Sequence, residues 1–295
     1  MPAFTLTCCS TADRPKSFFD DRDIPYACFH WSEAGVEHLD DLYQSITPEE
    51  FYAAIKAGAT PTTSQVSVGE FVELWEPVVS AGSDVLHVSL SSGLSGAYNA
   101  ATVAAAQVEA AHPGRRIRVV DSLGASSGYG MLVDYLADLR DEGAALDEAY
   151  GWALEHRLNV HHWFFSTDLT SYVRGGRVSR VSGFVGTALK ICPVLNMNDE
   201  GKLIPRDKIR TKAKAATDVV ARMEQHAEGG RSYAGKCSIS MSDCRADAEH
   251  VRDLVEARFP ALAGKVTIND IGTVIGSHTG PGTVALFFMG DRRGH

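Results

Sequence analysis

The alternation of strand-like and helix-like segments in the first half of the chain most constrains its fold. Residues 84–90, Asp-Val-Leu-His-Val-Ser-Leu, predict a buried strand, and the alanine-rich segment 97–111 predicts a helix that His-Pro-Gly at 112–114 ends. Residues 117–121 predict another strand, and apolar residues recur at helical spacing through 131–139. This β-α-β-α order favours a parallel sheet flanked by helices.

The second half of the chain has a different pattern. Residues 191–197 and 202–205 flank the turn Asn-Asp-Glu-Gly, which predicts a β-hairpin. Further strand-like segments occur at 160–165, 237–241 and 266–271, separated by helix-like stretches. We therefore expect two α/β domains, residues 1–165 and residues 166–291.

Composition argues against several classes of protein. The 28 basic and 37 acidic residues give a net charge of −9, whereas a nucleic-acid binder normally needs a basic face. The six cysteines show no C-x-x-C spacing, and the adjacent His161 and His162 would point to opposite sides of a strand, so no metal site is predicted. Without a signal peptide or an apolar run of about 18 residues, the expected location is the cytoplasm, with no stable membrane insertion.

Three segments concentrate hydroxyl side chains and glycine: 61–67, 91–96 and 276–282. The middle segment lies between a predicted strand and a predicted helix, where open α/β sheets bind their ligands. The helix start offers backbone N–H groups to a carboxylate or phosphate, and Ser92 and Ser95 could add hydroxyl hydrogen bonds. The alternative is that one serine only caps the helix.

The two outer segments allow both structural and functional interpretations. Thr63 could lie in a capped loop, with Ser67 capping the following helix. His278, between glycines, could be a surface turn residue or a donor to an anion whose charge favours the protonated ring. A hydrolase or transferase using Ser95 or Ser92 with His278 and Asp121 is conceivable, although no G-x-S-x-G or phosphate-binding glycine motif occurs.

Eight segments resemble, in order, the motifs of one protein family. They are Ser-Thr-Ala-Asp at 10–13, Pro-Thr-Thr-Ser-Gln at 61–65, Leu-Ser-Ser-Gly-Leu-Ser-Gly-Ala-Tyr at 90–98, Val-Asp-Ser at 120–122, Gly-Gly-Arg at 175–177, Lys-Ile-Cys-Pro-Val at 190–194, Lys-Ile-Arg-Thr at 208–211 and Ile-Gly-Ser-His-Thr-Gly-Pro-Gly at 275–282. With these motifs the sequence resembles the DegV family, the fatty-acid-binding proteins that serve bacterial fatty-acid kinases.

The resemblance implies a two-domain DegV-like (EDD) α/β fold with a lipid tunnel between or within the domains. The N-terminal domain would hold a parallel sheet. The ligand would be a long-chain fatty acid such as palmitate or oleate, and no cofactor is implied. Its carboxyl group would be held by Thr63 and Ser95, with Ser92 close behind and His278 near the same group. The protein would not be an enzyme; a separate fatty-acid kinase would convert the presented carboxyl group to an acyl phosphate.

A basic cluster in the second half has two interpretations. Its members are Lys202, Arg206, Lys208, Arg210, Lys212 and Lys214. They could form an ordinary solvated face, or they could dock the kinase. Arg177 and Arg210 match family arginines and are the candidates for docking. One departure from the family is Cys9, which stands where an aspartate is usual.

Overall fold

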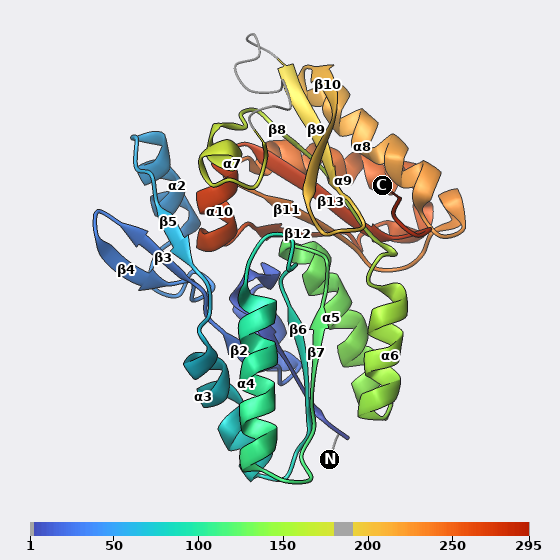
Figure 1. Ribbon diagram of the computed structural model, residues 1–295. Coiled ribbons are helices and arrows are strands. Elements are labelled where there is room, and N and C mark those ends of the chain that lie inside the picture. The colour runs from blue at the N-terminus through green and yellow to red at the C-terminus, as the bar shows by residue number, and fades with distance from the viewer. Residues whose placement is uncertain (1–2, 180–190, 295) are drawn as a thin grey trace.

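The computed structural model describes residues 3–179 and 191–294 and contains two sheet-based domains, one above the other in Figure 1. Lys190, which begins one of the motif segments, lies outside the described residues. Within the described ranges, no helix is long and apolar enough to cross a membrane.

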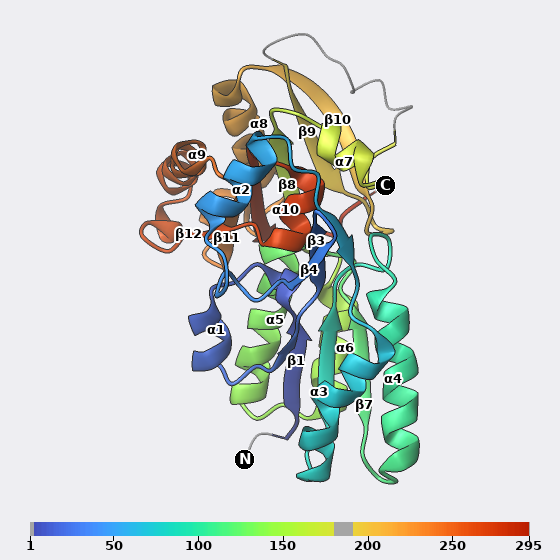
Figure 2. The same cartoon turned by 90° about the vertical axis from the view of Figure 1, so that its left-hand side faces the viewer.

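The N-terminal domain contains the predicted parallel sheet. Its strands, in the order β2-β1-β6-β7, are Tyr26–Ala27, Thr5–Cys9, Val85–Ser89 and Ile117–Asp121. Neighbouring strands all run parallel. The surrounding helices are α1 (Lys16–Asp21), α3 (Val68–Ser80), α4 (Ala97–Ala111), α5 (Ser126–Asp141) and α6 (Leu146–His156). The helices α3 and α4 pack together on one face, and α5 and α6 cover the other (Figure 2).

Local sequence explains why α3 forms where it does. Phe71, Trp75 and Val79 repeat every four residues and are buried against the sheet. Ser67 caps the helix as predicted, because its hydroxyl accepts from the Glu70 backbone while the Glu70 carboxylate accepts from the Ser67 backbone.

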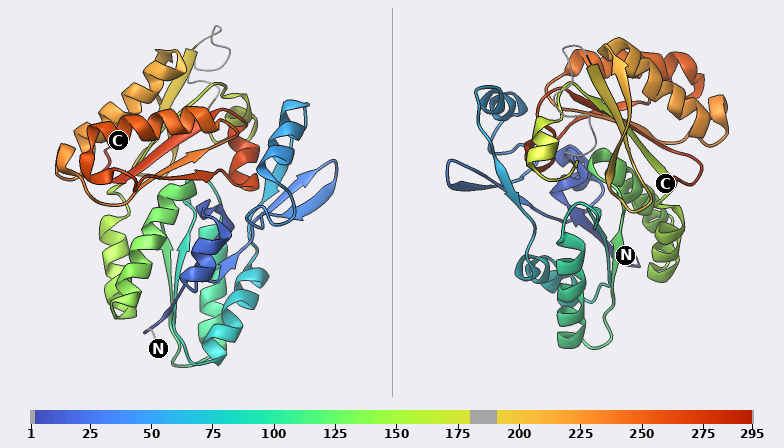
Figure 3. Two further views of the ribbon diagram at one scale, coloured as in Figure 1. Left: turned by 180° about the vertical axis from the view of Figure 1, so that it is seen from behind. Right: turned by 45° about the horizontal axis from the view of Figure 1, so that its top comes forward.

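A small antiparallel sheet was not predicted. It consists of β3 (His30–Glu33), β4 (Val36–Leu39) and β5 (Thr62–Ser64) in the order β4-β3-β5. Together with α2 (Pro48–Lys56) it stands out to one side of the two domains (Figure 3). Thr63 therefore lies in a strand rather than in a capped loop, and Trp31 is its partner on β3.

The C-terminal domain is built on a six-stranded sheet of order β10-β9-β8-β13-β11-β12. These strands are Leu203–Arg210, Ile191–Met197, Val160–Ser166, Thr283–Met289, Cys237–Met241 and Thr267–Asp270. All pairs are antiparallel except β11 with β12, and β9 with β10 is the predicted hairpin. The helices α8 (Lys212–His226) and α9 (Arg245–Arg258) pack on this sheet, and α5 reaches it from the N-terminal domain.

The strand β8 lies across the predicted domain boundary near residue 165. It pairs with β13 along its whole length, from Val160 opposite Met289 to Ser166 opposite Thr283. The strand thus belongs to the C-terminal sheet from its first residue, and the chain passes between the sheets just before Val160. The sequence could not show this, because the pairing partner lies more than a hundred residues later.

Short helices complete the fold. They are α7 (Thr170–Arg174), α10 (Thr273–Thr279) and the 3-10 helices Ser10–Ala12, Gly230–Ser232 and Pro260–Leu262. His278 therefore lies on α10, whereas the sequence suggested a glycine-rich turn. Gly280 and Gly282 follow this helix and lead into β13.

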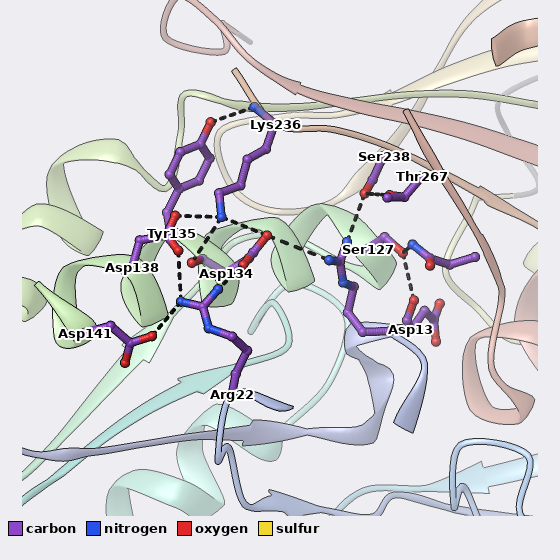
Figure 4. A network of polar contacts seen from close by, with 12 residues as sticks. Asp13, Arg22, Ser127, Asp134, Tyr135, Asp138, Asp141, Lys236, Ser238 and Thr267 are labelled. Atoms are coloured by element: carbon purple, nitrogen blue, oxygen red, sulfur yellow. Dashed lines mark hydrogen bonds and ion pairs between the residues drawn. The ribbon is translucent and has the colours of Figure 1, made fainter. Parts of the chain in front are cut away.

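The two domains are tied together through α5. Lys236, just before β11, lies 2.9 Å from Asp134 and 2.7 Å from Asp138 on that helix. Arg22 approaches the same two carboxylates at 2.9 and 2.8 Å from the N-terminal side (Figure 4). Asp134 and Asp138 therefore bridge cations from both domains and help to fix the relative position of the two sheets.

Candidate ligand-binding site

A cavity of about 570 Å³ lies between the two domains. Its size falls in the range usual for small-molecule sites. The residues that line it are Phe29, Thr63, Ser64, Gln65, Leu90, Leu94, Ser95, Gly96, Ala125, Ser126, His162, Phe164, Tyr172, Arg177, Met197, Leu203, Ile271, Val274, Ile275, His278, Thr279, Thr283, Ala285 and Phe287.

Strand alternation produces one apolar wall of the cavity. His162 and Phe164 on β8, with Ala285 and Phe287 on β13, all face the cavity. His161, the neighbour of His162, points instead towards α8, where it lies against His226. The prediction that the adjacent histidines point to opposite sides of a strand is therefore confirmed.

Polar side chains from four distant segments lie at one part of the cavity wall. Thr63 from β5 and His278 from α10 are joined by a hydrogen bond of 2.8 Å between Oγ1 and Nε2. Arg177, which follows α7, places Nη1 3.4 Å from Nδ1 of the same ring. Ser95 lies just before α4, and its Oγ accepts from the Ala97 backbone N–H at 3.2 Å. Each of the three hydroxyl-rich segments thus contributes a residue to this part of the wall.

The protonation state of His278 follows from its surroundings. Burial, followed by the positive charges of Arg177 and Arg174, lowers the pKa of His278 to about 4. The ring is thus neutral at pH 7, contrary to the protonated donor considered from sequence. The guanidinium can only donate, so Nδ1 accepts and the single ring N–H is on Nε2. This N–H donates to Thr63 Oγ1, which leaves the threonine hydroxyl proton available to another acceptor.

Arg177 is held by the backbone around this cluster. Its Nη1 donates to the Gly175 carbonyl at 2.6 Å, and its Nη2 donates to the Leu94 carbonyl at 3.1 Å. Gly175 itself permits the close approach of His278, because a Cβ there would lie 2.2 Å from Nδ1. The Gly-Gly-Arg motif therefore positions both the guanidinium and the imidazole.

The cavity opens near this polar cluster. Ser64, Gln65 and Gly96 line the cavity and are solvent-exposed. Ser92, the second serine predicted for the ligand, is also exposed but does not line the cavity. The backbone N–H of Ser92 donates to Asp121 at 3.1 Å. Of the two serines, only Ser95 lines the cavity.

The arrangement differs from a serine-hydrolase triad. In such a triad the histidine bonds the serine through one nitrogen and a carboxylate through the other. Here Nε2 of His278 bonds Thr63, and Nδ1 faces the cation of Arg177. Asp121 instead accepts from the backbones of Ser92 and Leu123. The structure does not bring Ser95, His278 and Asp121 together in the relay that the sequence allowed.

Comparison with known proteins decides the family. A family model described as "Uncharacterised protein, DegV family" matches residues 6–291. The chain belongs to the DegV family. A DegV domain-containing protein of Clostridium perfringens is 34% identical over 293 residues, covering 99% of both chains.

Solved DegV structures share the fold. A DegV protein of Thermus thermophilus, described as binding fatty acid, superposes with a TM-score of 0.86 at 27% identity, covering 98% of this chain and all of the other. A Thermotoga maritima protein, reported to reveal a fatty-acid-binding function, gives a TM-score of 0.82 at 26% identity over 98% of this chain. The two-domain α/β prediction is confirmed.

Two buried carboxylates explain a DegV motif whose role the sequence did not reveal. Asp13 Oδ1 accepts from the Gly272 backbone N–H at 3.0 Å, and Asp40 Oδ1 accepts from that of Thr273 at 3.2 Å. Both carboxylates thus cap the N-terminus of α10, the helix that carries His278. Burial raises the pKa of both groups. The only signal in the sequence was Asp13 in its motif, without its distant partner.

Cys9, at the position where the resemblance to the family implied an aspartate, is fully buried. Its backbone N–H donates to the Tyr129 hydroxyl at 3.0 Å, and its Sγ lies 3.7 Å from Nε2 of His87. Burial raises the pKa of the Cys9 thiol well above its usual value. The thiol is therefore protonated and poorly suited to nucleophilic chemistry.

Proposed function

We propose that this protein binds one long-chain fatty acid with its acyl chain in the cavity and its carboxylate at Thr63 and Ser95, next to His278. The observation that carries the proposal is the polarity of the cavity. Aromatic and aliphatic side chains make up most of its walls, whereas Thr63, Ser95 and Arg177 lie beside its exposed mouth. An amphipathic acid has the same division between an apolar chain and one anionic end.

The electrostatics of the polar cluster favour an anion. The charges of Arg177 and Arg174, which lower the pKa of His278, would stabilise a carboxylate at the same place. Thr63 has a hydroxyl proton to donate, since the imidazole N–H already occupies its oxygen as acceptor. The N-terminus of α4, which begins immediately after Ser95 and Gly96, adds a positive dipole end.

The relatives support the choice of ligand. The solved DegV protein of Thermus thermophilus and the solved protein of Thermotoga maritima are both described as binding fatty acid. In this chain the acyl portion would supply most of the affinity, at about 0.8 kcal/mol for each buried CH₂ group. Such a ligand should remain bound through purification.

The direct test is mass spectrometry of an organic extract from protein purified without added lipid. One equivalent of a long-chain fatty acid is expected, and its identity would give the preferred chain. An extract without fatty acid, together with no thermal stabilisation by palmitate or oleate, would contradict the proposal.

The proposal includes presentation of the carboxyl group to a separate fatty-acid kinase. Arg210 is exposed at the end of β10, so it is available to a partner. Arg177, the second docking candidate, has its guanidinium bonded to Leu94 and Gly175 and facing His278. We therefore assign docking chiefly to Arg210, while Arg177 organises the carboxylate site next to the mouth.

A hydrolase remains the alternative class. It would use Ser95 or Ser92 as nucleophile with His278 as base, but the ring of His278 is engaged by Thr63 and Arg177. A serine-reactive fluorophosphonate probe separates the two functions. Labelling of either serine would favour the enzyme, and no labelling together with stoichiometric fatty acid would favour the binding protein.

A further inference from the structure

Three side chains of the kinds that bind metals meet on the face of the six-stranded sheet that lies away from the cavity. They are His161 on β8, His226 at the end of α8 and Asp291 just after β13. One ligand atom from each lies within 4.8 Å of the others. Across residues 3–179 and 191–294, this is the one group of three such side chains that meets this condition.

The spacing of the ligand atoms fits a small ion. Asp291 Oδ1 is 3.0 Å from Nε2 of His161 and 3.2 Å from Nδ1 of His226. Zinc bonds of about 2.0–2.1 Å in tetrahedral geometry separate neighbouring ligand atoms by about 3.3 Å. The Asp291 carboxylate already reaches both ring nitrogens, and the two imidazoles, which stack with centroids 5.0 Å apart, would turn to direct both nitrogens at one ion.

Backbone contacts hold the three side chains in place before any ion arrives. The Asp291 N–H donates to the His226 carbonyl at 2.9 Å, and the Gly290 N–H donates to the Asn159 carbonyl at 2.9 Å. A Cβ at Gly290 would lie 2.1 Å from the His226 carbonyl oxygen, so the close crossing of these segments requires glycine there. His161 is further fixed by stacking on Phe288 at 5.0 Å.

Access to the site also suits a metal ion, since His161 is buried whereas the other two side chains reach the surface. The side chains of His226 and Asp291 are 33% and 61% exposed, which opens the site to ions and to water ligands. The nearby charge of Arg293 opposes a cation and limits the affinity.

We propose that His161, His226 and Asp291 bind one divalent transition-metal ion of the zinc class. Two imidazoles and one carboxylate form a ligand set that suits Zn²⁺ better than Mg²⁺ or Ca²⁺, which prefer oxygen ligands alone. The ion fastens the C-terminal segment to α8 and to β8. This site is separate from the lipid cavity, and the proposal does not depend on the proposed function.

The test uses the full chain without an affinity tag, treated with EDTA and dialysed. Titration calorimetry with ZnCl₂ should show one site per chain, and zinc should raise the melting temperature. His226→Ala and Asp291→Asn should each weaken zinc binding by at least about tenfold and abolish the thermal shift. His250→Ala, which removes an exposed histidine of α9, should bind zinc as the wild type does. MgCl₂ should give no shift.

Two results would overturn the proposal. One is the absence of stoichiometric zinc binding by the wild-type chain, which would leave the cluster as a hydrogen-bonded His-Asp-His group. The other is equal zinc binding by the wild type and His226→Ala, which would place the ion elsewhere. Because both substituted side chains are partly exposed, the variants should fold, and circular dichroism checks this directly.

Discussion

Replacing Thr63 by valine tests the proposed carboxylate site with minimal change in shape. The substitution removes the hydroxyl that bonds His278 and, in our proposal, donates to the ligand. A hydrogen bond to a charged group contributes about 1.5–3 kcal/mol. Each 1.4 kcal/mol is about tenfold, so palmitate should bind about 10- to 150-fold more weakly.

The same substitution also affects the free protein. The His278 N–H loses its acceptor whether or not ligand is present, so this loss lowers stability but largely cancels from the affinity. An unsatisfied buried donor costs about 1–3 kcal/mol, which should appear as a lower melting temperature of the ligand-free chain. Affinity and stability must therefore be measured separately.

The assay is displacement of a fluorescent fatty acid by palmitate and by methyl palmitate. Thr63→Val should weaken palmitate binding more than methyl palmitate binding, since the ester carries no charge. Thr62→Val is the matched control, because Thr62 is adjacent on β5, exposed and absent from the cavity lining. Equal affinities of wild type and Thr63→Val for palmitate would refute the placement of the carboxylate.

Three further predictions concern the cavity wall, the surface and a buried histidine. Ala285→Phe fills the cavity beside Phe164, so long-chain acids should lose about fourfold in affinity for each displaced CH₂ group. Shorter acids should bind as they do to the wild type. Equal losses of affinity for all chain lengths would contradict this placement of the acyl chain. Arg210→Ala should leave fatty-acid affinity unchanged in the same displacement assay but slow phosphorylation by the kinase. Lys265→Ala, exposed near the opposite sheet edge, should change neither the affinity nor the phosphorylation rate. Loss of lipid binding by Arg210→Ala would refute its docking role. Burial lowers the pKa of His87 to about 3, so only the unfolded chain gains this proton between its ordinary pKa of about 6.5 and pH 3. The free energy of unfolding should therefore decrease as the pH is lowered through that window. In His87→Gln, measured by chemical denaturation at each pH, it should depend less steeply on pH. An unchanged pH dependence would mean that His87 is protonated in the native state.

Elements with local sequence signals were predictable. The helix 97–111 was predicted with the bounds that the structure gives, because alanines mark its buried face and His-Pro-Gly stops it. The strand β6 was recognisable because three of its five residues are Val or Leu, and the structure buries all five. In the small sheet, by contrast, every residue of β4 is exposed, so no buried face repeats along the strand.

The short helix α10 was missed for a different reason. Its glycines favour a turn, and its N-terminus has no local side-chain cap. The stabilising groups are Asp13 and Asp40, carboxylates more than 230 residues earlier in the chain. A cap supplied from another domain leaves no signature in the helix sequence. The bond between Thr63 and His278 was hidden for the same reason, although both residues were selected individually.

The polar cluster depends on the two domains being held together. Thr63 and Ser95 precede β8, whereas Arg177 and His278 follow it, so neither half of the chain contains the whole carboxylate site. A shift between the domains would separate the hydroxyl of Thr63 from the imidazole before disturbing either sheet. The carboxylates of α5 that contact Lys236 and Arg22 resist such a shift (Figure 4). Weakening that contact should therefore reduce ligand affinity from a distance, even though none of its residues lines the cavity.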